Sequence, residues 1–177
     1  MHPHIDHVIF SAEEIAKRVS EIGAQITADY MNSRPLMICI LRGASIFMAD
    51  LVRAVELPID IDFMAVSSYG KAAHSSGVVR IVKDLDTPLI DRDVIIVEDV
   101  LDSGLTLKYL SSNLSARNPR SIEIATLLLK NPSPAITPKY IGFDCPNEFV
   151  VGYGLDYAER YRNLPFIGAL KREIYTV

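Results

Sequence analysis

The sequence predicts an α/β domain with a mainly parallel sheet that carries helices on both faces. Apolar runs typical of strands alternate with segments of helical periodicity, which is the pattern of parallel strands joined by crossover helices. Several of these runs are continuous, as in strands buried on both faces. Hydrophobic residues make up 49% of the chain and aromatic residues only 8%, so the core is expected to be mostly aliphatic. A length of 177 residues suits one domain, and we expect residues 1–177 to form it.

Helix caps, periodicity and chain breakers place each element along the sequence. Ser11 and Glu14 form a capping box, and apolar residues follow them at helical spacing. The stretch 67–77 is small and polar, so we expect it to form a mobile loop. The expected elements are, in order, a helix at 12–31, a strand at 36–41, a helix at 46–55, strands at 59–66, 78–82 and 94–97, a helix carrying Leu107, Leu110 and Leu114, and strands at 122–129, 140–143 and 149–153. Ligands of such a sheet are expected at the carboxyl ends of its strands.

Composition and charge argue against several classes of function. The formal net charge of -4 makes a broad basic surface for nucleic acid unexpected. Cys39 and Cys145 lie far apart in the sequence and indicate neither a disulfide framework nor a zinc site. No signal peptide pattern stands at the amino terminus, and no apolar stretch reaches the ~20 residues that a membrane helix needs. We therefore expect a cytoplasmic protein without a membrane partner, and we interpret the histidines of residues 1–7 as part of a solvated tail.

The segment that follows the strand at 94–97 indicates an anion site. Ser103, Gly104 and Thr106 stand where a helix begins, and the free N–H groups there attract anions together with the helix dipole. Glycine lets a phosphate approach the backbone, and the two hydroxyls can add hydrogen bonds. Taken by itself, a short acidic loop of this kind also suits an ordinary helix cap, with Asp102 or Ser103 as the capping residue.

Three carboxylates, those of Glu98, Asp99 and Asp102, flank this anion site. They would repel a phosphate placed directly on them, so they must serve something beside it. Ribose hydroxyls, a metal ion or a proton to be removed would each fit. A phosphorylated sugar with a neighbouring base satisfies all of these needs together.

Resemblance to a known family sharpens this interpretation. The run 97–106, VEDVLDSGLT, resembles the phosphoribosyl pyrophosphate signature of type I phosphoribosyltransferases, and the likeness to their hypoxanthine-guanine branch extends over most of the chain. The resemblance implies the fold of that family, with a small hood contributed by the terminal segments and a mobile active-site loop. It implies that Glu98 and Asp99 hold the ribose hydroxyls and that Asp102 is the general base. The residues implied to bind the 5′-phosphate are Asp102, Ser103, Gly104, Leu105 and Thr106.

Other segments resemble the pyrophosphate loop and the lid of this family. Arg42 and Gly43 resemble a loop in which a strained peptide meets pyrophosphate, and Arg162 matches an arginine near the pyrophosphate. Taken alone, an arginine beside a turn glycine is more often a surface residue. Ser68 and Tyr69 resemble the serine-tyrosine pair of a lid that shields the reactive centre from water.

Two later segments are implied to bind the base. Lys130 follows the strand at 122–129 and matches the lysine that donates to the 6-oxo oxygen of the purine. Phe149 is implied to stack on the purine ring, and Val150 to read the base through its backbone. The resemblance therefore favours 6-oxopurines over adenine, which presents an amino group at the same place.

The implied reaction joins hypoxanthine or guanine to 5-phosphoribosyl pyrophosphate and releases pyrophosphate. Mg²⁺ is the implied cofactor; Asp156, in the purine-binding block, is implied to bind it, with Glu98 and Asp99 as further candidates. The family usually forms homodimers or homotetramers, so we expect a homo-oligomer. Two alternatives stay open: a xanthine-preferring enzyme of the same family, and an RNA-binding pyrimidine-operon regulator on the same scaffold, against which the net acidity counts.

Overall fold

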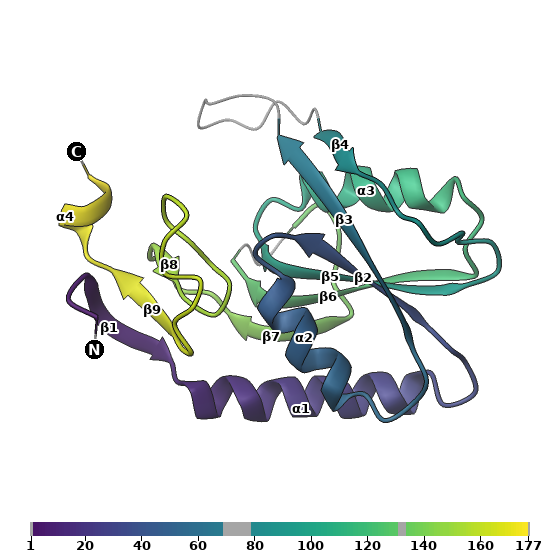
Figure 1. The fold of residues 1–177 in the computed structure, drawn as a ribbon, viewed down its shortest axis with the longest axis horizontal. Coiled ribbons are helices and arrows are strands. Elements are labelled where there is room, and N and C mark those ends of the chain that lie inside the picture. The colour runs from purple at the N-terminus through teal and green to yellow at the C-terminus, as the bar shows by residue number, and fades with distance from the viewer. Residues whose placement is uncertain (1, 69–78, 131–133, 177) are drawn as a thin grey trace.

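The computed structural model describes residues 2–68, 79–130 and 134–176, and the predicted α/β architecture is confirmed in them. A central sheet of six strands has the order β4-β3-β2-β5-β6-β7, and a separate sheet of three strands has the order β1-β9-β8 (Figure 1). The elements are, in chain order, β1 (Ile5–Phe10), α1 (Ala12–Asp29), β2 (Leu36–Leu41), α2 (Ser45–Ala54), β3 (Asp60–Ser68), β4 (Val79–Lys83), β5 (Asp93–Leu101), α3 (Leu105–Ser115), β6 (Ser121–Leu129), β7 (Tyr140–Asp144), β8 (Val150–Val151), β9 (Ile167–Leu170) and α4 (Arg172–Tyr175).

The central sheet is parallel except at one edge. β2 pairs in parallel with β3 and β5, β5 with β6, and β6 with β7, whereas β4 runs antiparallel to β3. From β2 the chain builds one side of the sheet through β3 and β4, and it then crosses to β5 on the other side of β2. Because ligands of such sheets bind where the strand order reverses, the carboxyl ends of β2 and β5 mark the place to look for a site.

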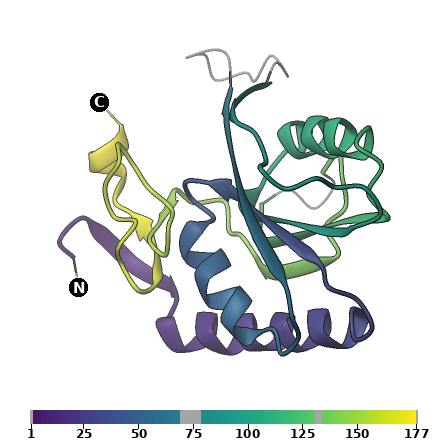
Figure 2. The same ribbon diagram turned by 45° about the vertical axis from the view of Figure 1, so that its right-hand side comes forward.

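Helices cover both faces of this sheet, as the sequence predicted (Figure 2). α1 and α2 bury Ile22 and Phe47 against one face, where they meet Ile95 of β5. α3 buries Leu110 on the other face against Ile96 of the same strand. Neighbouring residues of β5 thus point into different halves of the core, which explains its continuous apolar sequence. None of the helices in the described ranges combines the length and the apolar character needed to cross a membrane.

The capping box at the start of α1 is confirmed by both of its hydrogen bonds. The Glu14 N–H donates to Ser11 Oγ at 3.2 Å, and the Ser11 N–H donates to the Glu14 carboxylate at 2.8 Å. These bonds satisfy two backbone donors that the first helical turn would otherwise leave without partners.

β5 extends beyond the apolar run that predicted it. The strand was expected at 94–97, but ladder pairing with β6 continues through Glu98, opposite Thr126, to Leu101, opposite Leu129. Glu98 and Asp99 are therefore strand residues with fixed directions. This rigidity matters for the site because side chains on a strand are held more firmly than those on a loop.

The three-stranded sheet corrects the expectation of a solvated amino-terminal tail. β1 pairs antiparallel with β9, so the two ends of the chain lie side by side in one small sheet (Figure 1). His4 belongs to this structure, since its Nδ1 lies 2.7 Å from the Tyr161 hydroxyl oxygen. β9 and α4 were not predicted either. β1 and β9 come from the two terminal segments, from which the hood was expected.

Two further predictions of strand bounds were wrong. The strand expected at 149–153 is only β8, because Gly152, Tyr153 and Gly154 have φ angles of 101°, 51° and 99°, which lie outside regular strand geometry. The loop expected at 67–77 begins later than predicted, since β3 continues to Ser68. The rest of that loop, from Tyr69 on, lies outside the described residues.

Candidate active site

A cavity of about 390 Å³ opens at the carboxyl ends of β2 and β5, where the topology places the expected site. Its walls come from three parts of the chain: the turn after β2, the end of β5 with the start of α3, and the segment that follows β8. Most of the predicted site residues line it, namely Arg42, Gly43, Glu98, Asp99, Asp102, Ser103, Gly104, Thr106, Asp156 and Arg162. Segments more than a hundred residues apart in the sequence thus meet in one cavity.

The other predicted residues that the structure describes do not line this cavity. Leu105 begins α3 with 44% of its surface exposed, and Lys130, Phe149 and Val150 lie elsewhere. Asp156, which the sequence placed with the purine-binding residues, lines the cavity of the phosphoribosyl residues instead. Of the predicted lid pair, Ser68 ends β3 and Tyr69 lies outside the described residues.

The amino end of α3 presents free N–H groups to the cavity. Its N-cap residue is Gly104, with a φ of 74° and no side-chain cap, so neither Asp102 nor Ser103 caps the helix. The nearest hydroxyl, Ser103 Oγ, accepts from the Leu105 N–H only at the long distance of 3.5 Å. With Thr106 in the cavity wall, this helix end has the features of an anion site.

Glycines allow the three walls to approach one another closely. A Cβ atom added to Gly43 would lie 1.6 Å from a carboxylate oxygen of Asp99. One added to Gly154, which has a φ of 99°, would lie 2.2 Å from the Gly43 carbonyl oxygen. Just before this contact, the peptide bond between Leu41 and Arg42 is cis. The turn after β2 is therefore packed between β5 and the segment after β8.

The paired acids at the end of β5 differ in their surroundings. Burial raises the pKa of the Glu98 carboxyl well above its ordinary value, and the neighbouring charge and hydrogen bond of Asp99 raise it further. Asp99 instead accepts a hydrogen bond from the Val100 N–H at 2.8 Å. Two adjacent carboxyl groups suit the binding of neutral hydroxyl groups, which can donate hydrogen bonds to their oxygens.

Two arginines are held at the far side of the cavity. Arg162 Nη2 lies 2.8 Å from an Asp156 carboxylate oxygen, and Arg162 Nη1 donates to the Gly154 carbonyl at 2.8 Å. The Arg162 Nε is buried without a hydrogen-bond partner in the described part of the chain. Together with Arg42, this guanidinium supplies the positive charge and planar donors that phosphate groups require.

Glu159 joins these two arginines and was missed in the sequence. Its carboxylate lies 3.0 Å from Arg42 Nη1 and 3.4 Å from Arg162 Nη2. Its N–H donates to Asp156 Oδ2 at 2.9 Å, and its φ of 63° belongs to a tight turn. The only signal in the sequence was an acid three positions before an arginine, which is too common to single out.

The predicted base-binding lysine lies beside the predicted general base. The Lys130 N–H donates to the Leu101 carbonyl at 2.8 Å, so Lys130 emerges next to the residue before Asp102. Burial raises the pKa of the Cys145 thiol. The charge of Lys130 lowers this pKa and the charge of Asp102 raises it, so both side chains lie near the thiol. Lys130 and Asp102 therefore flank the same small region at the ends of β5 and β6.

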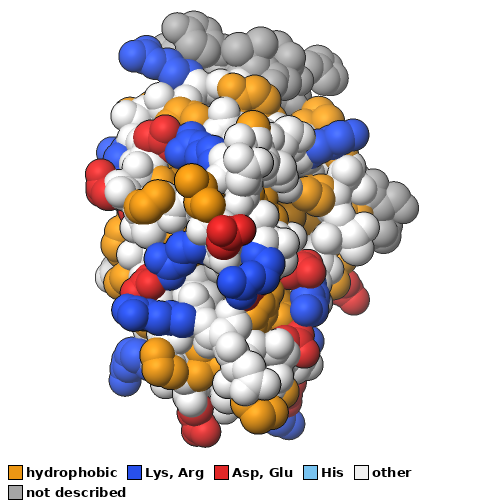
Figure 3. All heavy atoms as spheres, turned by 90° about the vertical axis from the view of Figure 1, so that its right-hand side faces the viewer, with side chains coloured by type: hydrophobic (Ala, Val, Ile, Leu, Met, Phe, Trp, Pro, Cys, Tyr) orange, Lys and Arg blue, Asp and Glu red, His pale blue; other side chains and the backbone are white. Residues whose placement is uncertain are grey.

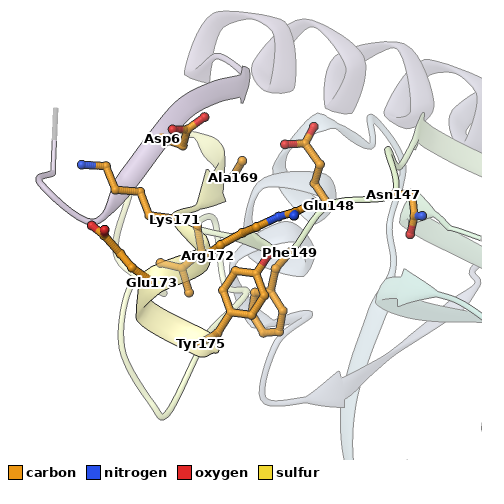
Figure 4. A pocket seen from close by; sticks show the side chains of 10 residues that line it. Asp6, Asn147, Glu148, Phe149, Ala169, Lys171, Arg172, Glu173 and Tyr175 are labelled. Carbon is orange, nitrogen blue, oxygen red and sulfur yellow. The ribbon is translucent and has the colours of Figure 1, made fainter. Parts of the chain in front are cut away.

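A second cavity, of about 550 Å³, contains Phe149 (Figure 4). It is bordered by the segment before β8, by the end of β9 and by α4, and it shares no residue with the first cavity. Val150 pairs with Ala169 in the small sheet, next to this cavity. The sequence predicted Phe149 as a base-stacking residue but gave no sign of Tyr175, which borders the same cavity.

The donor set of the first cavity suits a metal ion that is bound mostly by a substrate. No cluster of three or more metal-binding side chains occurs within the described ranges. The cavity does offer separate carboxylates on opposite walls, those of Asp156 and the pair Glu98 and Asp99. Mg²⁺ typically binds one or two carboxylates together with substrate phosphates and waters, so these residues fit it.

Comparison with known proteins agrees with this geometry. Residues 8–158 match the family model of the phosphoribosyl transferase domain. The chain is 52% identical over 97% of its length to hypoxanthine-guanine phosphoribosyltransferases of Mycobacterium tuberculosis (strain CDC 1551 / Oshkosh) and Bacillus subtilis (strain 168), covering 89% and 96% of them. It also superposes on the crystal structure of a hypoxanthine phosphoribosyltransferase from Staphylococcus aureus with a TM-score of 0.96 and 44% identity, covering 100% of this chain and 97% of that one.

Proposed function

The chain belongs to the phosphoribosyltransferase family, and from this premise we propose that it is a purine-salvage enzyme. It transfers the 5-phosphoribosyl group from phosphoribosyl pyrophosphate to hypoxanthine or guanine and releases IMP or GMP with pyrophosphate. One observation carries the proposal: a single cavity combines an uncapped helix end, two arginines and four carboxylates. A doubly phosphorylated sugar needs all three kinds of group at once.

We propose that the sugar phosphate lies across the cavity from α3 to the arginines. The 5′-phosphate binds the free N–H groups of the α3 amino end with Ser103 and Thr106. The ribose hydroxyls bind Glu98 and Asp99. The pyrophosphate lies toward the turn after β2, where Arg42 and Arg162 neutralise part of its charge. The close contacts of Gly43 and Gly154 support this arrangement, since they hold the turn that carries Arg42 between Asp99 of β5 and the segment that carries Asp156 and Arg162.

The chemical step joins an imidazole nitrogen of the purine to C1 of the ribose while the bond from C1 to the pyrophosphate oxygen breaks. Positive charge develops at C1, and the carboxylates at the end of β5 stabilise it. Asp102 accepts the proton that leaves the purine ring. When bound, Mg²⁺ neutralises the pyrophosphate and improves it as a leaving group, and we propose Asp156 as its carboxylate ligand, with Glu98 and Asp99 as further candidates.

We propose that Lys130, Phe149 and Val150 bind the base. The position of Lys130 beside Asp102 supports this, because a donor to the 6-oxo oxygen must lie near the base that deprotonates the same ring. Phe149 would stack on the ring and Val150 would contact it through its backbone. Hypoxanthine and guanine share the 6-oxo group, so these contacts suit both.

Several features of the wider molecule are also proposals. We propose that residues 1–177 act as one domain with the three-stranded sheet as its hood, that Ser68 and Tyr69 belong to a lid, and that the protein works in the cytoplasm.

We also propose a homodimer or homotetramer, since Ile61 and Phe63 of β3 remain 51% and 37% exposed. Light scattering would test the assembly, and a mass of 19.7 kDa, that of one chain, would contradict it.

Ligand binding separates this function from the RNA-binding alternative. Lys and Arg side chains are interspersed with Asp and Glu on the face shown in Figure 3, which supports no basic RNA surface there. In calorimetry with Mg²⁺, we expect phosphoribosyl pyrophosphate to bind, and Arg162→Ala to bind it less tightly than the wild type. Affinity for RNA that falls steeply between two salt concentrations, without binding of the sugar phosphate, would instead indicate the regulator.

A further inference from the structure

Tyr175, at the end of α4, stacks on the ring of Phe149. The two ring centroids lie 4.8 Å apart, and the planes are inclined by only 24°. Figure 4 shows the two rings face to face at the border of the second cavity, although they come from segments on either side of β9. Offset stacks of this kind stabilise an aromatic pair beyond the area that they bury.

Phe149 is held from two other directions as well. Tyr157 meets it edge to face, with centroids 5.4 Å apart and planes at 89°. Its carbonyl oxygen accepts the Leu170 N–H at 2.8 Å, which fixes the backbone against the strand that leads to α4. Tyr157 directly follows Asp156, so the row of three rings links the last helix to the wall of the first cavity.

The ring of Phe149 nevertheless keeps surface for a ligand. It remains 38% exposed although two aromatic rings contact it, and it borders a cavity of about 550 Å³. A phenylalanine this exposed would ordinarily sample several rotamers. Contact with the Tyr175 ring reduces the orientations open to Phe149, which lowers the entropy that a stacking ligand would otherwise have to remove.

We propose that Tyr175 is a positioning residue for the purine base, acting through Phe149. The inference rests on the proposed function, since it takes Phe149 as the ring on which the base stacks. Tyr175 contacts one side of that ring and leaves the exposed side to the base, so that base, Phe149 and Tyr175 form a continuous stack. Removing Tyr175 loosens Phe149 and weakens binding of the base, while the phosphoribosyl cavity is unaffected.

Steady-state kinetics of Tyr175→Ala and Tyr175→Phe test this role. For Tyr175→Ala we expect KM for hypoxanthine to rise roughly 3- to 10-fold, the scale of one aromatic pair, with kcat and KM for phosphoribosyl pyrophosphate near wild type. Tyr175→Phe keeps the stacked ring and should restore the wild-type KM. Tyr109→Ala removes an exposed tyrosine from α3 and serves as the control, with wild-type values expected throughout.

Each other outcome overturns the positioning role. An unchanged KM in Tyr175→Ala means that the stack does not reach the base. A lowered KM means that Tyr175 occupies the place of the base instead of supporting Phe149. A fall in kcat, together with a lower mass in light scattering, indicates a role in assembly. If the wild type forms no nucleotide from any purine, the proposed function itself fails, whereas an active wild type with a normal Tyr175→Ala removes only this inference.

Discussion

Gly43 leaves no room for even one added methyl group beside the cavity. A methyl group there would overlap the Asp99 carboxylate, which the strand and its own hydrogen bond hold in place. The turn after β2, with Arg42, would have to move away from β5. The position therefore couples packing to the proposed binding of pyrophosphate.

Gly43→Ala is expected to raise KM for phosphoribosyl pyrophosphate at least about tenfold and to destabilise the fold by roughly 1–3 kcal/mol, as overpacking does. Kinetics and denaturant unfolding measure the two effects. Ala49→Ser, at an exposed position of α2, is the control. Wild-type affinity for the sugar phosphate in Gly43→Ala would show that the substrate does not depend on this turn.

Asp102 is proposed to take the proton of the purine. Asp102→Asn keeps the shape of the side chain but cannot accept a proton, so we expect turnover to fall by about 10² to 10⁴-fold. Binding of phosphoribosyl pyrophosphate, measured by calorimetry, should remain. Asp86→Asn, at an exposed carboxyl of a surface turn, should change neither value. A wild-type rate constant in Asp102→Asn would refute the assignment of the base.

Lys130 is proposed to recognise the 6-oxo group. Lys130→Ala should raise KM for hypoxanthine and guanine more than KM for phosphoribosyl pyrophosphate, because only the base loses a donor. Lys108→Ala, at an exposed position of α3, provides the comparison. An unchanged preference among purines would remove Lys130 from this role.

At the scale of elements, a polar contact ties the end of α1 to the edge of the sheet. The Tyr140 hydroxyl of β7 donates to the Asp29 carboxylate at 2.7 Å, and Lys139 Nζ lies 3.0 Å from the same oxygen. The hydrogen bond from Tyr140 lowers the pKa of Asp29, and the bond from Lys139 lowers it further. Tyr140 is almost fully buried, so its hydroxyl depends on this partner.

Tyr140→Phe should therefore lower the free energy of unfolding by about 1 kcal/mol at neutral pH. Because the folded protein holds the pKa of Asp29 below its unfolded value, this stabilisation is present above about pH 4 and is lost as the pH falls further. Urea unfolding of the wild type and Tyr140→Phe at pH 7 measures the lost free energy. Urea unfolding of the wild type and Asp29→Asn at pH 7 and pH 3 measures its dependence on pH. The difference in free energy of unfolding between the wild type and Asp29→Asn should be smaller at pH 3 than at pH 7. A difference that grows on acidification would contradict the account.

The sequence predicted those elements whose signals are local. The capping box placed the start of α1, and the apolar run at 36–41 gave β2 with its observed bounds. β1 and β9 carried no such signal, since each becomes a strand only by pairing with the other end of the chain. The end of β5 was placed too early because Glu98 and Asp99 are poor strand formers that the ladder with β6 holds extended.

The candidate site shows the same division between local and distant signals. Residues 98–104 could be predicted from a contiguous pattern, and they lie together in the structure. Glu159 and Tyr175 could not, because their roles depend on contacts with Arg42 and Phe149 that only the folded chain creates. The sequence also did not predict that Phe149 borders a cavity other than the one lined by residues 98–104.

At the scale of the whole molecule, the proposed site draws on both the central sheet and the small sheet. The central sheet brings the ends of β2 and β5 together and so builds the cavity proposed for the sugar phosphate. Phe149 and Val150, which are proposed to bind the base, lie at β8 of the small sheet, whereas Lys130, proposed for the same role, follows β6 of the central sheet. The segment from Gly152 to Arg162 belongs to both, because it leaves β8 and returns to the cavity with Asp156 and Arg162. We therefore expect catalysis to depend on this segment, which joins the small sheet to the cavity.

The most direct test of the central claim is nucleotide formation from phosphoribosyl pyrophosphate with hypoxanthine, guanine, xanthine and adenine, each with and without Mg²⁺. We expect IMP or GMP to form at the highest rates, adenine to be a poor substrate, and turnover to need the metal ion. Turnover of xanthine above the other bases would change the substrate assignment within the family. No turnover of any purine in the presence of Mg²⁺ would contradict the proposed function.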